Sequence, residues 1–178
     1  MKVAIHQPGF IPWFPFFYKM AQADLFIILT HTDFEKNNTQ NRYLLNETDK
    51  WVTKSVKSGK STIGQKEYAD GISLFTLNMY WINAIRMTLG IKTRVEFDYP
   101  TKLTKTERLI DLVKHYGGDT YVTNPSAKDK YLDEDLMRAS GVEIEYCSPP
   151  KHLLRHTFEV FADYGIDGAI RQLPRRKI

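Results

Sequence analysis

Five consecutive apolar residues, Leu25 to Leu29, constrain the fold of this chain more than any other sequence feature. An uninterrupted apolar run of this length is typical of a strand buried on both faces, as in a parallel sheet. A shorter apolar-rich run, Lys2 to His6, precedes it and ends at the turn signal Gln7-Pro8-Gly9, and the segment Phe16 to Ala23 predicts a helix. The opening therefore predicts strand, loop, helix and strand. The loop His6 to Pro15 should lie at the carboxyl edge of the sheet, where open α/β folds bind ligands.

The rest of the chain continues this pattern. Twice in the second half a helical pattern, a Gly and a short strand follow one another, which implies crossover connections and largely parallel pairing. The 178 residues fit one domain, so we expect a single α/β domain over residues 1–178. We predict a mixed, mostly parallel sheet with flanking helices and a β-hairpin excursion. The expected hairpin strands are Arg42 to Leu45 and Trp51 to Val56; the helices are Ser73 to Leu89, Thr106 to Tyr116 and Tyr131 to Ala139; the later strands are Thr120 to Thr123 and Val142 to Tyr146.

Cysteine usage and hydropathy indicate the compartment. Cys147 is the single cysteine, so no intrachain disulfide can form and an oxidising compartment is not indicated. The N-terminal residues lack the apolar stretch of a secretory signal, and no window approaches the ~20 apolar residues of a spanning helix. We expect a cytoplasmic protein without a membrane span. The residues identify neither a cofactor nor an oligomeric state.

The Pro-rich loop after the first strand is the first candidate site. It can hold His6 and Gln7 in fixed rotamers, and a histidine can act as acid or base near neutral pH. Gln7 can both donate and accept hydrogen bonds, and Trp13 can form the wall of a pocket. A structural histidine and a core tryptophan are the competing interpretations.

A second polar cluster follows the apolar strand and should lie at the same sheet edge as His6. It contains Asp33, Glu35 and Lys36, and then Asn41 and Arg42. Arginine suits a bidentate contact to phosphate or carboxylate. We therefore consider His6 a candidate base and Asp33 its partner or a second acid-base group. The other four side chains are candidates for substrate binding, and an ordinary solvated loop is the alternative.

Basic residues concentrate in two places, within a formal net charge of +4. One is the segment Lys50 to Lys66 and the other is the C-terminal tail. The residues that could contact nucleic acid there are Lys54, Lys57, Lys60, Arg175 and Arg176. They lack the interleaved aromatic side chains of single-strand binders, so any contact should be weak and electrostatic. A solvated hairpin and a basic chain end would look the same.

No metal site is evident in the sequence. His152 and His156 stand four residues apart, which could place both on one helix face toward zinc. No Glu follows His152, so the HExxH pattern is absent. We expect two exposed histidines in a basic segment.

Several motifs together resemble the WbqC-like protein family. They include Ile5-His6-Gln7-Pro8 with Pro12-Trp13, the Phe17-Tyr18-Lys19 helix, Ala23-Asp24, Asp33-Phe34 and Asn41-Arg42-Tyr43, and they continue as far as Ser140-Gly141-Val142. The resemblance implies a role in surface-polysaccharide (O-antigen) biosynthesis. It suggests a transferase that modifies a nucleotide-activated amino sugar, with transfer of an acyl or aminoacyl group as the expected reaction.

The chain departs from that family in two places. Members commonly have Asp-Asp-Val-Gln-Phe where this chain has Thr30-His31-Thr32-Asp33-Phe34, and residues 158–178 form a divergent, basic C-terminal segment. These departures leave a second hypothesis open, a phage- or host-encoded protein that modifies nucleic-acid bases or binds nucleic acid. The opening also resembles nucleotidylyltransferases with an HxGH loop, although the second histidine is missing.

Overall fold

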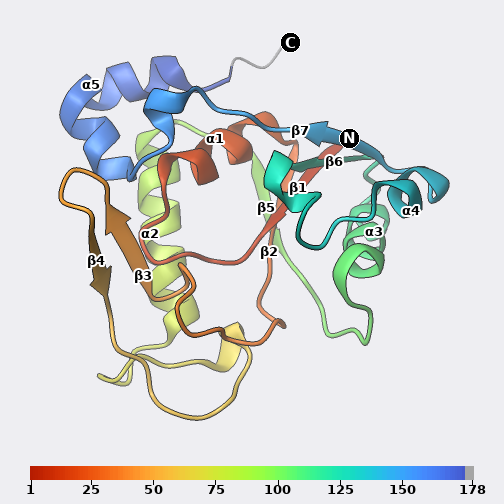
Figure 1. Cartoon of the computed structure of the whole chain (residues 1–178), viewed down its shortest axis with the longest axis horizontal. Coiled ribbons are helices and arrows are strands. Elements are labelled where there is room, and N and C mark those ends of the chain that lie inside the picture. Colours follow the sequence, from red (N-terminus) through yellow and green to blue (C-terminus); the bar gives the residue numbers. More distant parts are fainter. Residues whose placement is uncertain (175–178) are drawn as a thin grey trace.

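A five-stranded parallel sheet lies at the centre of the protein (Figure 1). The computed structural model describes residues 1–174. The strands run in the order β5-β2-β1-β6-β7, and each pairs with its neighbours in parallel. Their bounds are Lys2–His6 for β1, Leu25–Ile28 for β2, Arg94–Phe97 for β5, Thr120–Thr123 for β6 and Glu143–Tyr146 for β7.

Alternating side chains of the central strands belong to two separate cores. Phe26 and Ile28 of β2 pack into one apolar cluster, whereas Leu25 and Ile27 pack into the other. All four are fully buried. The uninterrupted apolar run therefore reflects a strand covered on both faces, as its pattern predicts.

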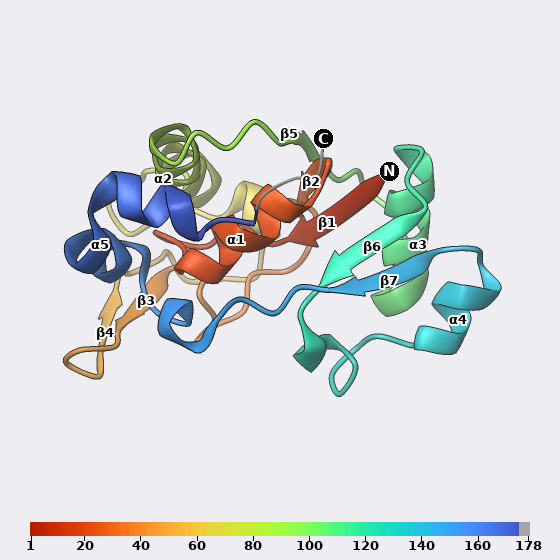
Figure 2. The ribbon, with the colours of Figure 1, turned by 90° about the horizontal axis from the view of Figure 1, so that it is seen from above.

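Helices cover both faces of this sheet (Figure 2). The first cluster includes residues of α1, α2 and α5, and the second includes residues of α3 and α4. Their bounds are Phe14–Gln22 for α1, Leu74–Thr88 for α2, Lys105–His115 for α3, Glu134–Ala139 for α4 and Thr157–Gln172 for α5. Within residues 1–174, no helix is both long and apolar enough to cross a membrane.

The strand order places a switch point beside β1. The chain leaves β1 through α1 toward β2 on one side, and it reaches β6 on the other side through α3, which packs on the opposite face. No crossover connection therefore covers the carboxyl ends of β1 and β6. In open α/β sheets this is the place where ligands bind.

The α/β class, the mostly parallel sheet and the hairpin excursion are confirmed. The antiparallel hairpin consists of β3 (Arg42–Leu45) and β4 (Lys50–Thr53), and it extends away from the main sheet (Figure 1). The sequence prediction missed β5 and α5. It also began the helix before Gly141 too early, because Asp133 caps α4 and its carboxylate accepts a hydrogen bond from the Leu136 N–H at 3.0 Å.

The N-terminus of α5 fastens the loop that follows β1. His156 is the N-cap of α5, and one of its ring nitrogens accepts a hydrogen bond from the Phe158 N–H. Its other nitrogen, Nε2, donates to the Ile11 carbonyl at 3.1 Å, and the Thr157 hydroxyl donates to the Pro12 carbonyl at 2.6 Å. The expectation that His156 is exposed is therefore wrong: it is fully buried.

We predict that His156→Ala lowers the free energy of unfolding by about 2–4 kcal/mol. The substitution removes a helix cap and leaves the buried Ile11 carbonyl without its donor. His152→Ala is the matched control, because His152 is exposed, and its effect should stay within about 0.5 kcal/mol. Urea unfolding of both variants measures the difference. Equal effects would show that α5 does not hold the loop.

Candidate functional site

Two cavities meet at the carboxyl edge of the sheet, around the end of β1. The larger has a volume of about 730 Å³ and is lined by residues beyond the ends of β1, β2 and β6 and by the first turns of α3. The smaller has a volume of about 190 Å³ and lies between the loop after β1, α1 and the start of β3. His6, Thr39 and Asn124 line both cavities. The end of β1 therefore stands at their junction.

A buried amide network holds the loop after β1 in place. The Asn78 side-chain amide donates to the carbonyls of Pro8, at 2.9 Å, and Gln40, at 2.7 Å. The Tyr68 hydroxyl donates to the Asn78 side-chain oxygen at 2.7 Å, and the Gln40 side chain donates to Gln7 Oε1 at 2.8 Å. Tyr68, Gln40 and Asn78 are fully buried, so the loop is rigidly positioned before any ligand arrives.

The His6 ring is neutral and offers one free nitrogen. Its Nδ1 lies 2.8 Å from the Gln7 carbonyl, so Nδ1 carries the hydrogen and donates. Nε2 is then unprotonated, and it has no hydrogen-bond partner within residues 1–174. Burial, with the nearby charge of Lys19, lowers the pKa of His6 from 6.5 to about 3. His6 therefore presents a lone pair, not a positive charge, at physiological pH.

Lys19 is a buried amine beside His6. It extends from α1, has an exposed fraction of 3%, and lines the smaller cavity. Its Nζ donates to the Ile5 carbonyl at 3.2 Å, and it has no carboxylate partner in the described chain. Burial lowers its pKa from 10.5 to about 8. The protein thus keeps a mostly protonated amine in an apolar setting, which is costly unless a ligand compensates it.

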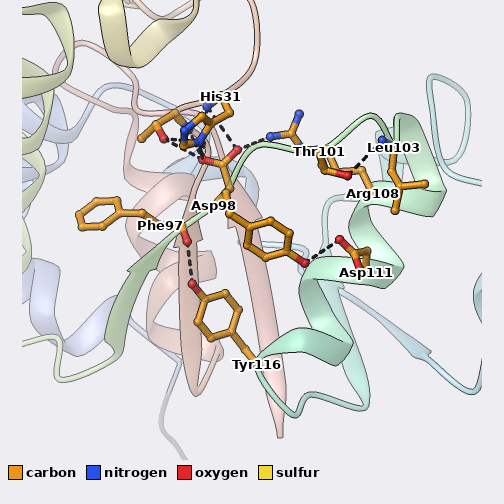
Figure 3. A network of polar contacts seen from close by, with 10 residues as sticks. His31, Phe97, Asp98, Thr101, Leu103, Arg108, Asp111 and Tyr116 are labelled. Carbon is orange, nitrogen blue, oxygen red and sulfur yellow. Dashed lines mark hydrogen bonds and ion pairs between the residues drawn. The ribbon is translucent and has the colours of Figure 1, made fainter.

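Cationic side chains border the larger cavity. Lys105 and Arg108 come from the first turns of α3, and Lys130 comes from the loop after β6. Arg108 forms an ion pair with the fully buried carboxylate of Asp98, which also accepts hydrogen bonds from Thr30 and His31 (Figure 3). The ion pair with Asp98 therefore fixes the orientation of the Arg108 guanidinium at the wall of the cavity.

The pKa of Asp98 reflects this arrangement. Burial alone raises the pKa of its carboxyl, but the hydrogen bonds from Thr30 and His31 and the charge of Arg108 outweigh burial and hold it below the usual value. Asp98 is thus ionised at neutral pH. Two buried polar atoms at this cavity, Arg108 Nε and Thr32 Oγ1, have no partner within the described chain.

The structure divides the site residues predicted from the sequence between the two cavities. His6 lines both, Gln7 and Glu35 line the larger one, and Trp13 and Arg42 line the smaller one. The Arg42 guanidinium also lies over the ring of Trp51, 4.2 Å from its centroid. These five side chains therefore lie around the same edge of the sheet.

Three other predicted residues line neither cavity. Asp33 is exposed and forms a backbone bridge with Thr62, and the Gln7 carbonyl, not Asp33, orients the His6 ring. Lys36 is exposed. Asn41 is buried, and its amide donates to the Lys54 carbonyl at 2.9 Å, which supports the base of the hairpin.

Sequence reasoning missed the cations and amides that complete the site. The missed lining residues are Lys19, Thr39, Lys105, Arg108, Asn124 and Lys130. Two of them carried a usable signal: Asn124 follows the predicted strand Thr120 to Thr123 at the same sheet edge, and Lys19 belongs to the family motif Phe17-Tyr18-Lys19. Within residues 1–174, no three His, Cys, Asp or Glu side chains gather around one point.

The candidate nucleic-acid contacts are partly neutralised. Lys54 pairs with Asp70 and Lys57 with Glu67, whereas Lys60 is exposed. The remaining two, Arg175 and Arg176, lie outside the described residues. Two of the three candidate lysines in the segment Lys50 to Lys66 are therefore already paired with carboxylates.

Comparison with known proteins identifies the family. The WbqC-like protein family matches residues 7–71 and 65–163. The chain belongs to the WbqC-like protein family. It is also similar to Rv1507c of Mycobacterium tuberculosis (strain ATCC 25618 / H37Rv), described as an uncharacterized protein, with 28% identity over 82% of this chain and 81% of that protein. No solved structure gives a significant match.

We predict that the free energy of unfolding falls as the pH drops from 7 to 4.5, and that His6 causes part of this loss. The pKa of His6 is about 3 in the folded state and 6.5 in an unperturbed chain. Between these values the unfolded state binds a proton that the folded state does not, so stability present above pH 6.5 is lost as pH decreases. His6→Asn should flatten this slope.

Urea unfolding at a series of pH values measures the slope. His152→Asn, at an exposed position, is the control and should keep the wild-type slope. If His6→Asn and His152→Asn behave alike, His6 is not held neutral by its surroundings.

Proposed function

We propose that this WbqC-like protein is a transferase that binds a nucleotide-activated amino sugar and transfers an acyl or aminoacyl group to it. One observation carries the proposal: a cavity of about 730 Å³ at the switch point of the sheet is bordered by three cationic side chains and by His6. Binding cavities for small molecules typically measure about 300–1,000 Å³. Its position and size suit a nucleotide sugar.

The distribution of charge supports a diphosphate in this cavity. Lys105 and Lys130 are its cations without an ion pair in the described chain, Arg108 is paired with Asp98, and Glu35 is the only carboxylate among its described lining residues. Thr104 is the N-cap of α3, but its side chain makes no hydrogen bond to the first N–H groups of the helix. Helix N-termini and arginine both favour phosphate.

Polar side chains of the larger cavity suit the sugar part of the proposed nucleotide-sugar substrate. Gln7 and Glu35 line the same cavity and can bond to sugar hydroxyls. Gln7 is held by Gln40, and Asn38 donates to the Glu35 carboxylate at 3.2 Å. With the phosphates at α3, the amino sugar extends toward His6 at the junction of the cavities.

The proposed reaction joins the sugar amine to an activated carboxylic acid, such as a thioester or acyl phosphate. The amine nitrogen attacks the acyl carbon, a C–N bond forms, and the bond from the acyl carbon to the leaving group breaks. His6 Nε2 accepts the proton that the nitrogen loses and returns it to the leaving group. Its low pKa makes it a weak base in the empty protein; a bound diphosphate favours the protonated ring and raises that pKa.

Membership of the family supports a biological setting for this reaction. WbqC-like proteins take their name from gene clusters for bacterial surface polysaccharides, so the modified sugar would serve as a precursor there. Nucleic-acid binding through the hairpin region is not proposed, because two of its lysines, Lys54 and Lys57, are already paired with carboxylates.

We predict that Lys130→Ala weakens the binding of a nucleoside diphosphate about tenfold, because it removes one charge-assisted contact to phosphate. Lys128→Ala is the matched control. Lys128 lies two residues away, pairs with Glu134 at 3.4 Å and does not line the cavity, so its loss should leave affinity unchanged. Calorimetric titration with UDP, GDP and dTDP in turn measures this. Equal affinities of the two variants, or no binding of any of the three nucleotides to wild type, would contradict the proposal.

A further inference from the structure

The smaller cavity contains a buried cation that the protein itself does not neutralise. Lys19 has an exposed fraction of 3%, and a single backbone carbonyl, that of Ile5, accepts from its Nζ. An ammonium group has three donors, so two of them lack a hydrogen-bond acceptor in the described chain, and the group's other contact there is with the Phe26 ring, whose centroid lies 5.9 Å from Nζ. A buried charge without its counter-charge destabilises a protein, which suggests that Lys19 is kept for a ligand.

Two other unpartnered polar atoms of residues at this cavity are also donors. The Trp13 and Arg42 side chains line it, and Trp13 Nε1 and Arg42 Nε are buried without a hydrogen-bond partner in the described chain. No Asp or Glu is among the lining residues within positions 1–174. The cavity therefore favours a ligand with acceptor oxygens and a negative charge.

Its walls and size restrict the rest of the ligand. Phe10, Ile11 and Phe16 form part of an apolar lining, together with Pro12 and Pro15. The volume of about 190 Å³ is too small for a nucleotide. It exceeds the ~150 Å³ that an apolar cavity needs to hold benzene. One ring or a short branched chain with a carboxyl group fits.

We propose that the smaller cavity is a subsite for a compact apolar carboxylic acid whose carboxylate pairs with Lys19. Taken with the proposed function, on which this part rests, the acyl portion of the thioester or acyl phosphate occupies this cavity, and its acyl oxygen takes the place of one carboxylate oxygen at Lys19. His6 lines both cavities, and its pKa responds to the charge of Lys19, so the two groups are close. The carboxyl carbon would then lie next to the sugar amine at the junction.

Titration with benzoate tests the subsite, with benzamide as the neutral ligand of nearly the same shape. Wild type should bind benzoate about tenfold more tightly than benzamide, because a charge-assisted contact replaces a neutral one. Lys19→Met should fold, since it replaces a buried charge by an apolar chain of similar volume, and should lose this preference. Lys66→Met is the matched control: Lys66 is 4% exposed, its Nζ donates to the Gly59 carbonyl, and it lines neither cavity.

The pH dependence gives a second readout that needs only wild type. Benzoate stays anionic from pH 7 to 9.5. Because the pKa of Lys19 is about 8, benzoate affinity should decrease over this range as Lys19 loses its proton, whereas benzamide affinity should not. Equal binding of the two probes by wild type, an unchanged preference in Lys19→Met, or a flat benzoate affinity up to pH 9.5 would overturn the subsite.

The same samples separate this inference from the proposed function. A benzoate preference without binding of UDP, GDP or dTDP would support the carboxylate subsite and reject the nucleotide-sugar transferase. Nucleotide binding without a benzoate preference would support the larger cavity as a nucleotide site and reject the subsite.

Discussion

Parallel pairing of β1 with both β2 and β6 determines where this protein can bind a ligand. Three carboxyl ends lie side by side at one edge, and the chain leaves β1 and enters β6 through helices on opposite faces. Because these two connections diverge to opposite faces of the sheet, neither of them covers the carboxyl end of β1. His6, the last residue of β1, stands at that point by virtue of the topology alone. The other side chains that line this edge therefore surround His6.

Buried polar groups in this protein fall into two classes. Asn78 and Asp98 have partners for their side-chain oxygens and lie in the supporting structure behind the cavities. Lys19 has only one acceptor for its three donors, and Trp13 Nε1 has no partner in the described chain. Of the six buried side-chain atoms without a partner in the described chain, four belong to cavity-lining residues (Trp13, Thr32, Arg42 and Arg108), and the other two belong to Asn41 and Ser61. This division is expected of a preorganised binding site, where polar groups wait for a ligand and pay little reorganisation when it binds.

Much of the fold follows from sequence patterns because β1 and β2 are buried on both faces and α2 and α3 keep regular apolar spacing. The strand β5 was missed because it is short, lies at the sheet edge and is only partly buried. The helix α5 was missed because Gly165 adopts a φ of 65° within it and interrupts the apolar period.

The candidate site, like the fold, could be predicted from the sequence only in part. His6 and Arg42 could be found because they lie directly at predicted strand ends. Lys19 and Arg108 look like ordinary polar residues of amphipathic helices, and only the packing of α1 and α3 against the sheet brings them to the cavities. Asp33 lies near the predicted sheet edge, but its backbone pairs with Thr62 and it lines neither cavity. Local patterns predict which strand end carries chemistry, whereas the direction of each side chain depends on contacts between distant segments.

The closeness of Lys19 and His6 couples the two cavities. Burial is the main cause of the low pKa of His6, and the charge of Lys19 lowers it further. A carboxylate bound to Lys19 would cancel that charge and remove the second cause, so the pKa of His6 would rise when the smaller cavity is filled. In the proposed reaction the negative charge develops on the acyl oxygen beside Lys19 as the amine attacks, so the ring becomes a better proton acceptor at that step. A base that strengthens as the amine attacks accepts the proton in the step where the nitrogen loses it, which gives the buried, unpaired lysine a role in the reaction.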